Sequence, residues 1–504
     1  MSIFVRYSSA FKPYRLTFPI NWAANPYNNK NWMHHFSSLR WLPAVKDGAD
    51  VERILKDFYD FHCVRKQKNP YYNQKTGDHT AAIRLGILSQ FWRKFTAQEQ
   101  LNASGICQRL LAAEVANLQS PSMYREGHNH GLMVDLALLR FVRDVPEKQS
   151  WVNIDLVIAR SSATVDAMWH ASGLSKEHSI SYQEYNLPLT VEYFELVASL
   201  GLQAQAKINL AKVREESRRF LGFALRANGE YFPLGDSFRL PNEKILNQVY
   251  GHADQPDAHA ATLLAPYAGA EGVYANEHFF IYRQRLNGRN IHFAATCCWD
   301  SHNHKQNDEL SFCLEVDGVS VFDDPGYTEF MPWEDMLRLK HEAAHSTLIM
   351  DDQPWSDVKA ANGRSKIVES STSTTGFRLL MTMERYPGFV CTREVALADG
   401  ELTVRDAITA ATGFNGESFQ RAFVLGSGLT AEAIDEVTWS LQDAASNPVA
   451  ELGFSAATRL ETQPIALVAR DRKLVDDSMQ LRSWYTAPVG ESAQFHLPTM
   501  TVRF

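Results

Sequence analysis

Residues 301–327 read SHNHKQNDELSFCLEVDGVSVFDDPGY. Two runs typical of β-strands, LSFCLEV and VSVF, are separated by Asp317-Gly318, a pair that favours a tight hairpin turn. Polar side chains stand at both ends of these runs: His302, His304, Asp308, Asp323 and Asp324. We expect a rigid hairpin that presents these groups together, which is a suitable platform for a functional site.

Further short runs of strand character, separated by Gly, Asp and Asn turns, lie on both sides of the hairpin in the sequence. The runs, including those of the hairpin, are HFFIYRQ, NIHFAAT, ELSFCLEV, VSVF, STLIMD, GFRLLMTMERY, GFVCTREVAL and ELTVRDAIT. Many short strands with turn residues between them are typical of an antiparallel β-sandwich.

Toward the N-terminus, apolar residues recur at helical spacing. The segments that we expect to be helical are 101–118, 132–142, 151–171, 188–201 and 205–226. Helix-breaking residues stand between them, among them Gly173, Pro188 and Gly201. We therefore predict a helical domain over residues 1–255 and a β-sandwich domain over residues 256–504, with a ligand site in the cleft between them.

Composition excludes several classes of function. The 504 residues carry a formal net charge of −8, and no segment is rich in Lys and Arg, so we expect no nucleic-acid partner. No apolar run is long enough to span a bilayer, and the six cysteines form no CxxC pair. The N-terminus lacks the apolar run of a signal peptide, so a cytoplasmic location is expected. Removal of an export signal would leave a periplasmic or secreted location open.

Two clusters in the helical half have both a functional and a structural interpretation. His128-Asn129-His130-Gly131 stands where a helix begins, so Asn129 and His130 can bind an anion there, or Asn129 can simply cap the helix. Tyr182 follows a polar stretch that begins at Glu177. Its phenol can be catalytic, or it can be a packing tyrosine with a bonded hydroxyl.

Two further clusters lie in the strand half. His304 before the hairpin and Asp324 after it are either site residues or solvated turn residues. His341-Glu342-Ala343-Ala344-His345 matches the HExxH pattern of zinc peptidases, which requires a helix. Because Ser346-Thr347-Leu348-Ile349-Met350 follows at once and is typical of a strand, a peptidase is the weaker hypothesis.

Taken in order, these clusters resemble the motifs of the heparinase II/III-like polysaccharide lyases, and the resemblance covers most of the chain. The similar segments are Asn129-His130-Gly131, Glu177-x-Ser179-x-x-Tyr182, Leu234-Gly235-Asp236, His304 to Phe312, Asp324-Pro325-Gly326-Tyr327 and His345-Ser346-Thr347. Each motif alone is weak, but six in the same order are specific. The resemblance implies an N-terminal α/α toroid, a C-terminal antiparallel β-sandwich and an active site between them.

The resemblance also implies an activity, the β-elimination of an acidic polysaccharide at a uronic acid, which leaves a 4,5-unsaturated uronide. It implies catalytic roles for Tyr182, His304, Asn129 and His130, and substrate binding by Arg125 and Glu177. A non-catalytic protein that binds acidic carbohydrate on the same scaffold is the alternative. The polysaccharide (glycosaminoglycan-like, alginate-like or capsular), the mode of action and the oligomeric state stay open.

One position departs from the family pattern. The family often binds a metal through the second histidine of His-x-His, and this chain has Gln306 there. The implied ligands are therefore Gln306, Asp324 and His345, with zinc as the first expectation and no organic cofactor. An amide oxygen is a poorer zinc ligand than an imidazole, so the ion can be weak, different or replaced by hydrogen bonds.

Overall fold

A computed structural model describes residues 3–7, 11–67, 77–251, 255, 257–300, 304–328, 333–351, 353, 355, 363–458, 460–487, 489 and 494–504. His302 lies outside the described residues. The chain divides into two compact units: unit 1 comprises Met1–Trp169 with Pro188–Leu210, and unit 2 comprises His170–Leu187 with Ala211–Phe504. This division groups residues that lie close together in space. The boundary between residues 255 and 256 rests on helix and strand content instead, and it stays a prediction.

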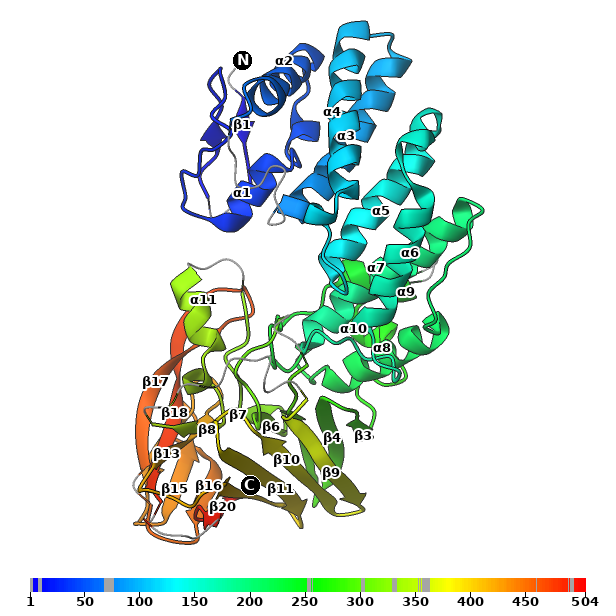
Figure 1. Cartoon of the computed structure of the whole chain (residues 1–504). Coiled ribbons are helices and arrows are strands. Elements are labelled where there is room, and N and C mark those ends of the chain that lie inside the picture. Colours follow the sequence, from blue (N-terminus) through cyan, green and yellow to red (C-terminus); the bar gives the residue numbers. More distant parts are fainter. Residues whose placement is uncertain are drawn as a thin grey trace. The chain divides into compact units, whose positions relative to one another are not determined.

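Unit 1 is built from helices that pack side by side (Figure 1). Its main helices are α1 (Lys30–Ser37), α2 (Gly48–Tyr59), α3 (Asp78–Ala97), α4 (Leu101–Gln119), α5 (Asn129–Asp144) and α6 (Ile154–Met168). Helix α5 is buried on nearly all sides, as its run of apolar residues predicts. A short two-stranded sheet, β1 (Phe4–Val5) and β2 (Tyr14–Arg15), lies near the N-terminus.

Helix α7 (Ile180–Ser199) begins eight residues earlier than expected, because it continues through Pro188. The prediction that Pro188 lies in a connection between helices is therefore wrong. Proline removes one N–H donor and crowds the preceding turn, but packing can offset that cost. Pro188 is itself buried. As a result, Tyr182 lies on the first turn of a helix rather than on a loop before one.

In unit 2, three helices pack against the start of the strand region. They are α8 (Leu210–Ala224), α9 (Glu243–Tyr250) and α10 (Ala260–Leu263). Their apolar side chains, among them Phe220, Leu246 and Leu263, form one core with Ile281 and Ala294 from the adjoining strands. Helices and strands thus share a hydrophobic core inside this unit.

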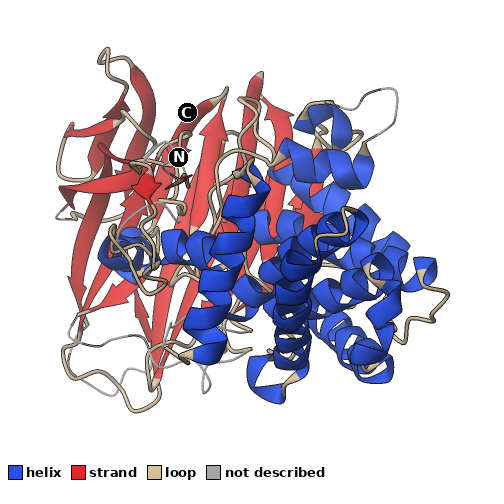
Figure 2. Cartoon of the chain, turned by 90° about the horizontal axis from the view of Figure 1, so that it is seen from above, coloured by secondary structure: helices blue, strands red, loops and turns tan. Residues whose placement is uncertain are grey.

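Among the described residues, the strands form three larger sheets, and every ladder between named strands is antiparallel. A five-stranded sheet contains β3 (Gly272–Ala275), β4 (Phe279–Leu286), β5 (Arg289–Thr296), β6 (Phe312–Val316) and β7 (Val319–Phe322). A four-stranded sheet contains β17 (Leu460–Val468), β18 (Leu474–Thr486), β13 (Ser418–Val424) and β8 (Leu348–Met350). The strands run side by side in Figure 2.

The third sheet has nine strands in the described part of the chain. They are β9 (Lys366–Ser373), β10 (Gly376–Met383), β11 (Phe389–Ala398), β12 (Glu401–Ala410), β14 (Thr430–Ala433), β15 (Thr438–Gln442), β16 (Pro448–Phe454), β19 (Gln494–His496) and β20 (Met500–Arg503). A large apolar core contains buried residues from all three of these sheets, for example Phe293, Phe377 and Phe423. This arrangement confirms the expectation of antiparallel sheets around a common core.

The hairpin of β6 and β7 forms as predicted. Val316 pairs with Val319, and Asp317 and Gly318 both have positive φ angles, 51° and 82°. This is the backbone of a two-residue turn that suits the twist of antiparallel strands.

Two further features bear on the sequence analysis, namely membrane-spanning helices and the state of the cysteines. Within the described residues, no helix combines the length and apolar character needed to cross a membrane. All six cysteines are free thiols in the structure, and five of them are buried.

Candidate functional site

The side chains of Tyr182 and His304 meet in unit 2. Their rings stack with centroids 3.4 Å apart and planes 16° apart. Tyr182 is half-buried on α7, and the His304 side chain, 22% exposed, precedes the hairpin. The structure therefore brings together the two residues to which the resemblance assigns proton transfer.

Two carboxylates flank the His304 ring. Its Nδ1 atom lies 3.3 Å from Asp236 Oδ2, and its Nε2 atom lies 3.7 Å from Glu177 Oε2. Glu177 is only 3% exposed. One of its contacts is His304, and substrate binding by Glu177 stays a prediction.

Asp236 is the anchor of this arrangement. Burial acts to raise the pKa of Asp236, but the charge of Lys340 and the hydrogen bond from His304 outweigh it, so the pKa lies below its usual value. Lys340 Nζ lies 2.5 Å from Asp236 Oδ2. Lys340 thus compensates a buried carboxylate.

The loop that carries Asp236 is also bound to the helix that carries Tyr182. Ser179 Oγ donates to the Asp236 carbonyl at 2.8 Å, and the Ile180 N–H donates to Ser237 Oγ at 3.0 Å. Gly235 has φ +68°, and a Cβ atom on it would lie 2.2 Å from the carbonyl oxygen of His178. Glycine is therefore required for this close approach.

The environment of Tyr182 keeps its phenol neutral. Burial raises the pKa of Tyr182 well above 10, and the nearby Tyr327, Asp236 and Glu177 add to the effect. A tyrosine that acts as a base would need the opposite shift. The phenol is thus suited to donate a proton.

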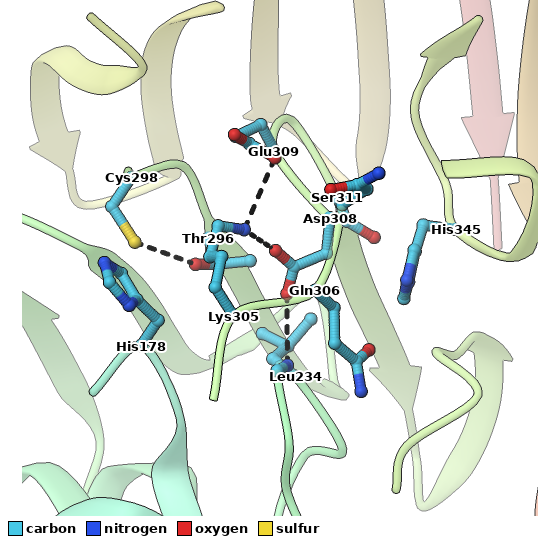
Figure 3. A network of polar contacts seen from close by, with 12 residues as sticks. His178, Leu234, Thr296, Cys298, Lys305, Gln306, Asp308, Glu309, Ser311 and His345 are labelled. Carbon is cyan, nitrogen blue, oxygen red and sulfur yellow. Dashed lines mark hydrogen bonds and ion pairs between the residues drawn. The ribbon is translucent and has the colours of Figure 1, made fainter. Parts of the chain in front are cut away.

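Lys305 is buried in the interior, so its ammonium group does not face a surface where a ligand could bind. Lys305 Nζ contacts Asp308 and lies 3.3 Å from Glu309 Oε2 (Figure 3). Arg385 Nη1 lies 2.6 Å from Glu309 Oε1. Asp308 also accepts from the Gly235 N–H at 3.1 Å. This ionic network holds the segment that follows His304 against the loop at Gly235.

The three implied metal ligands are all buried in unit 2. Gln306 is 1% exposed, and Asp324 and His345 are 0% exposed. His345 Nδ1 lies 2.9 Å from Asp324 Oδ2, and Ser311 Oγ donates to the same carboxylate oxygen at 3.2 Å. Two buried atoms, Gln306 Oε1 and His345 Nε2, have no hydrogen-bond partner among the described residues.

The remaining predicted residues, Arg125, Asn129 and His130, lie in unit 1. His130 Nδ1 is 2.9 Å from Asp78 Oδ1, and Arg125 Nε is 2.7 Å from Asp78 Oδ2. The side chains of His130 and Arg125 are 28% and 30% exposed, whereas Asp78 is buried. Asp78 thus orients an imidazole and a guanidinium that both reach solvent.

The structural interpretation of Asn129 needs a correction. The residue that caps α5 is His128, whose Nδ1 atom accepts from the His130 N–H at 3.1 Å. Asn129 is the first residue of the helix, and it is 1% exposed. Its side chain is therefore not used as the helix cap.

Sequence reasoning missed Asp78. Burial acts to raise the pKa of Asp78, but the hydrogen bond and charge of His130, together with the charge of Arg125, outweigh it and lower the pKa. Asp78 lies 52 residues before His130, at the start of α3, and no motif marks it. Its only sequence signal is an acidic residue in the first turn of a helix, which is too common to indicate a site.

The HExxH segment does not form a metal-binding helix. Residues Glu342–Ala344 form a single 3₁₀ turn, and His341 and His345 are its two capping residues. The His341 side chain is 60% exposed and the His345 side chain is buried, so the two imidazoles do not share one face. The peptidase hypothesis is therefore wrong.

Comparison with known proteins places the chain among lyase folds. Residues 283–467 match the family model described as Heparinase II/III-like, C-terminal. No curated protein gives a significant match in sequence.

Solved structures extend this likeness over nearly the whole chain. The crystal structure of heparinase III is similar with a TM-score of 0.71 and 13% identity, over 96% of this chain and 79% of that one. The crystal structure of a heparan sulfate lyase from Pedobacter heparinus has a TM-score of 0.63 and 14% identity, over 99% of this chain and 80% of that one. A chondroitinase AC lyase has a TM-score of 0.52 and 11% identity, over 94% of this chain and 76% of that one. At such identities the likeness shows the fold, and it confirms the predicted toroid and β-sandwich class.

Proposed function

We propose that this heparinase II/III-like chain is a polysaccharide lyase that cleaves an acidic, uronic-acid-containing polysaccharide by β-elimination. The observation that carries the proposal is the stacked pair of Tyr182 and His304, flanked by Glu177 and Asp236. A neutral phenol beside an imidazole supplies a proton donor and a proton acceptor within one small volume. The fold that the chain shares with heparan sulfate and chondroitin lyases supports the same conclusion.

The reaction begins with the proton on C5 of the uronate, next to its carboxylate. His304 accepts this proton at Nε2, which lies beyond hydrogen-bond distance of Glu177. The electron pair of the C5–H bond forms the C4–C5 double bond, and the bond from C4 to the leaving oxygen breaks. Tyr182 donates its hydroxyl proton to that oxygen, and the protonated His304 then returns a proton to the phenolate.

The stacking of the two rings favours removal and donation of protons on the same face of the sugar. Two side chains whose rings are 3.4 Å apart do not lie on opposite faces of a sugar ring. This arrangement suits a uronate in which the C5 proton and the leaving group are syn. The alternative is an anti elimination, in which His304 is the base on the face of the sugar opposite to Tyr182, and it would require the two rings to separate.

Negative charge grows on the uronate carboxylate as the C5 proton leaves, so the reaction needs hydrogen-bond donors directed at that group. We assign this role to Asn129 and His130, with Arg125 as a further cation. Asp78 accepts from His130 Nδ1, so the Nε2 atom of His130 remains available to the substrate.

The test is a panel of acidic polysaccharides, including heparan sulfate, chondroitin, hyaluronan and alginate, followed by ultraviolet absorbance of the unsaturated product. We expect the absorbance to rise with at least one substrate, and the rise to disappear with Tyr182→Phe. If a polysaccharide binds tightly but no unsaturated product forms, the non-catalytic binding protein is the correct alternative.

We further propose that Gln306, Asp324 and His345 hold a divalent metal ion, with zinc first. Gln306 Oε1 and His345 Nε2 are buried atoms with no hydrogen-bond partner among the described residues, and the Asp324 carboxylate lies beside His345, 2.9 Å from its Nδ1 atom. Such an ion would neutralise Asp324 and brace the loop after β7.

This second proposal is tested by replacing the atypical ligand. We expect Gln306→His to tighten zinc binding, because imidazole is the better zinc ligand, and His345→Ala to weaken it. The measurements are metal content and the melting temperature with and without chelator. Zinc affinity that neither substitution changes would exclude these three residues as ligands.

A further inference from the structure

A second cluster of ligand-type side chains lies elsewhere in unit 2, and neither the proposed catalytic residues nor the ligands above belong to it. The Nε2 atoms of His170 and His278 lie 3.1 Å apart. Asp300 Oδ2 lies 3.2 Å from the first and 2.5 Å from the second. Three potential electron-pair donors thus converge on one point.

The three residues come from separate segments whose backbones are held in place. His170 lies two residues after α6, and its N–H donates to the Leu174 carbonyl at 2.8 Å. His278 immediately precedes β4, and its carbonyl accepts from the Cys297 N–H at 3.1 Å. Asp300 follows β5, and its N–H donates to His178 Nε2 at 2.9 Å.

We propose that His170, His278 and Asp300 bind a first-row divalent transition metal ion, for which zinc is the probe. Two imidazoles and one carboxylate are a set that zinc and its neighbours prefer, whereas calcium and magnesium prefer oxygen ligands alone. Ligand atoms around a tetrahedral zinc ion at about 2.0–2.1 Å lie roughly 3.3 Å apart, so the three need to separate only slightly to admit it.

The surroundings also suit an ion. The His278 side chain is buried, with 3% of its surface exposed. The side chains of His170 and Asp300 are 19% and 31% exposed, which leaves a path for the ion and room for a water ligand. Without an ion, both imidazole nitrogens face the same oxygen of Asp300.

Two more potential ligands border the cluster. His178, His278 and Cys298 offer ligand atoms that all lie within 4.8 Å of one another. The Nε2 atom of His178 already accepts from the Asp300 N–H, so we do not assign it to the ion. In Figure 3, His178 and Cys298 lie on the opposite side of Lys305 from Gln306 and His345, so this cluster is separate from the implied family site.

The bound ion would connect the segment before α7 to the five-stranded sheet. His170 begins the stretch His170–Leu187, which carries Tyr182, and His278 and Asp300 flank the strands β4 and β5. The backbone N–H of Asp300 also donates to the His178 ring. The carbonyl of His178 in turn lies close to Gly235. We therefore assign the ion a structural role, which does not depend on the proposed reaction.

The experiment uses the full chain, stripped with chelator and titrated with zinc chloride, with calorimetry and elemental analysis as readouts. We expect His170→Ala and Asp300→Asn each to weaken zinc binding at this site by at least about 100-fold, since even residues that only support a ligand contribute 10–100-fold. The zinc-dependent rise in melting temperature should shrink in parallel.

Two controls make the outcome specific. Glu277→Gln removes a carboxylate next to His278 that bonds to Ser172 instead, and we expect zinc binding to be unchanged. His345→Ala disables the other proposed metal site and should leave this one intact. The proposal is overturned if the stripped chain binds no zinc, if His170→Ala and Asp300→Asn bind as tightly as the parent chain, or if Glu277→Gln weakens binding equally. Circular dichroism of each variant verifies that it folds.

Discussion

The imidazole of His304 lies flat on the phenol of Tyr182, with 3.4 Å between ring centroids. His304 adopts a positive φ of 52°, which is uncommon for a residue with a Cβ atom. Such a conformation persists only where the surroundings enforce it, and at His304 they include Asp236 and Glu177. The local strain is thus associated with the pair to which we assign proton transfer.

Loss of the Tyr182 hydroxyl should abolish turnover without loss of the fold. We expect Tyr182→Phe to lower kcat by about 10²–10⁴-fold, because the proton donor is removed while the ring remains. The melting temperature should stay near that of the parent chain. Tyr267→Phe is the matched control, since its hydroxyl bonds to Glu215 at an exposed position, and it should keep full activity.

Histidine replacements distinguish the proposed base from a bystander. His304→Ala should lower kcat by a similar factor, whereas His341→Ala, with a 60% exposed side chain, should have no effect. Full activity in His304→Ala would leave Tyr182 as the only proton-transfer group. The kinetics should be measured at saturating substrate, so that changes in binding do not obscure kcat.

Asp78 should be needed to position His130 and Arg125. We expect Asp78→Asn to lower kcat/KM and to reduce stability at neutral pH by about 1–3 kcal/mol, because a buried charge partner is lost. Since the folded pKa of Asp78 is lowered, its carboxylate stabilises the fold above the unfolded pKa, and that stabilisation is lost as the pH falls through the folded value.

The stability difference between the parent chain and Asp78→Asn should therefore shrink on strong acidification. Denaturant unfolding at several pH values measures it. A difference that does not vary with pH would show that the lowered pKa of Asp78 does not contribute to folding.

Gly235 should tolerate no side chain. We expect Gly235→Ala to destabilise the fold and to reduce activity, because its Cβ atom would lie 2.2 Å from the His178 carbonyl oxygen. Gly318→Ala is the control: its φ is also positive, +82°, but no atom lies within 4 Å of the added Cβ. Equal losses of activity in the two variants would show that backbone strain, rather than the close approach, explains the effect. Unfolding curves and initial rates are the readouts.

His62 should make the protein sensitive to acid. Burial, and to a smaller extent the charge of Arg84, lowers the pKa of His62 to about 2. The unfolded chain takes up a proton near pH 6.5, which the folded chain excludes, so stability is complete above that value and declines below it. Between pH 7 and pH 5 the loss is about 2 kcal/mol.

Substitution of His62 should remove that part of the acid sensitivity. The ring lies 4.3 Å from the Phe58 ring, so His62→Leu preserves an apolar filling of similar size. We expect a flatter profile of unfolding free energy against pH for the variant. An unchanged profile would assign the acid sensitivity to other groups.

The local structure of this protein was largely predictable from sequence. The Asp317-Gly318 turn, the strand runs and most helices follow from periodicity and turn chemistry, which act over a few residues. Pro188 was the exception, because whether a helix continues through a proline depends on what packs around it rather than on the proline itself.

The sequence by itself determined which side chains can carry the chemistry, since Tyr182, His304, Asn129 and His130 lie in ordered motifs. Only the tertiary structure decided their partners: Asp78 for His130, Asp236 for His304, and the meeting of His170 with His278 across 108 positions. The physical reason is that turns and helices depend on neighbouring residues, whereas ion pairs and ligand clusters depend on packing between distant segments. No local pattern in the chain encodes that packing.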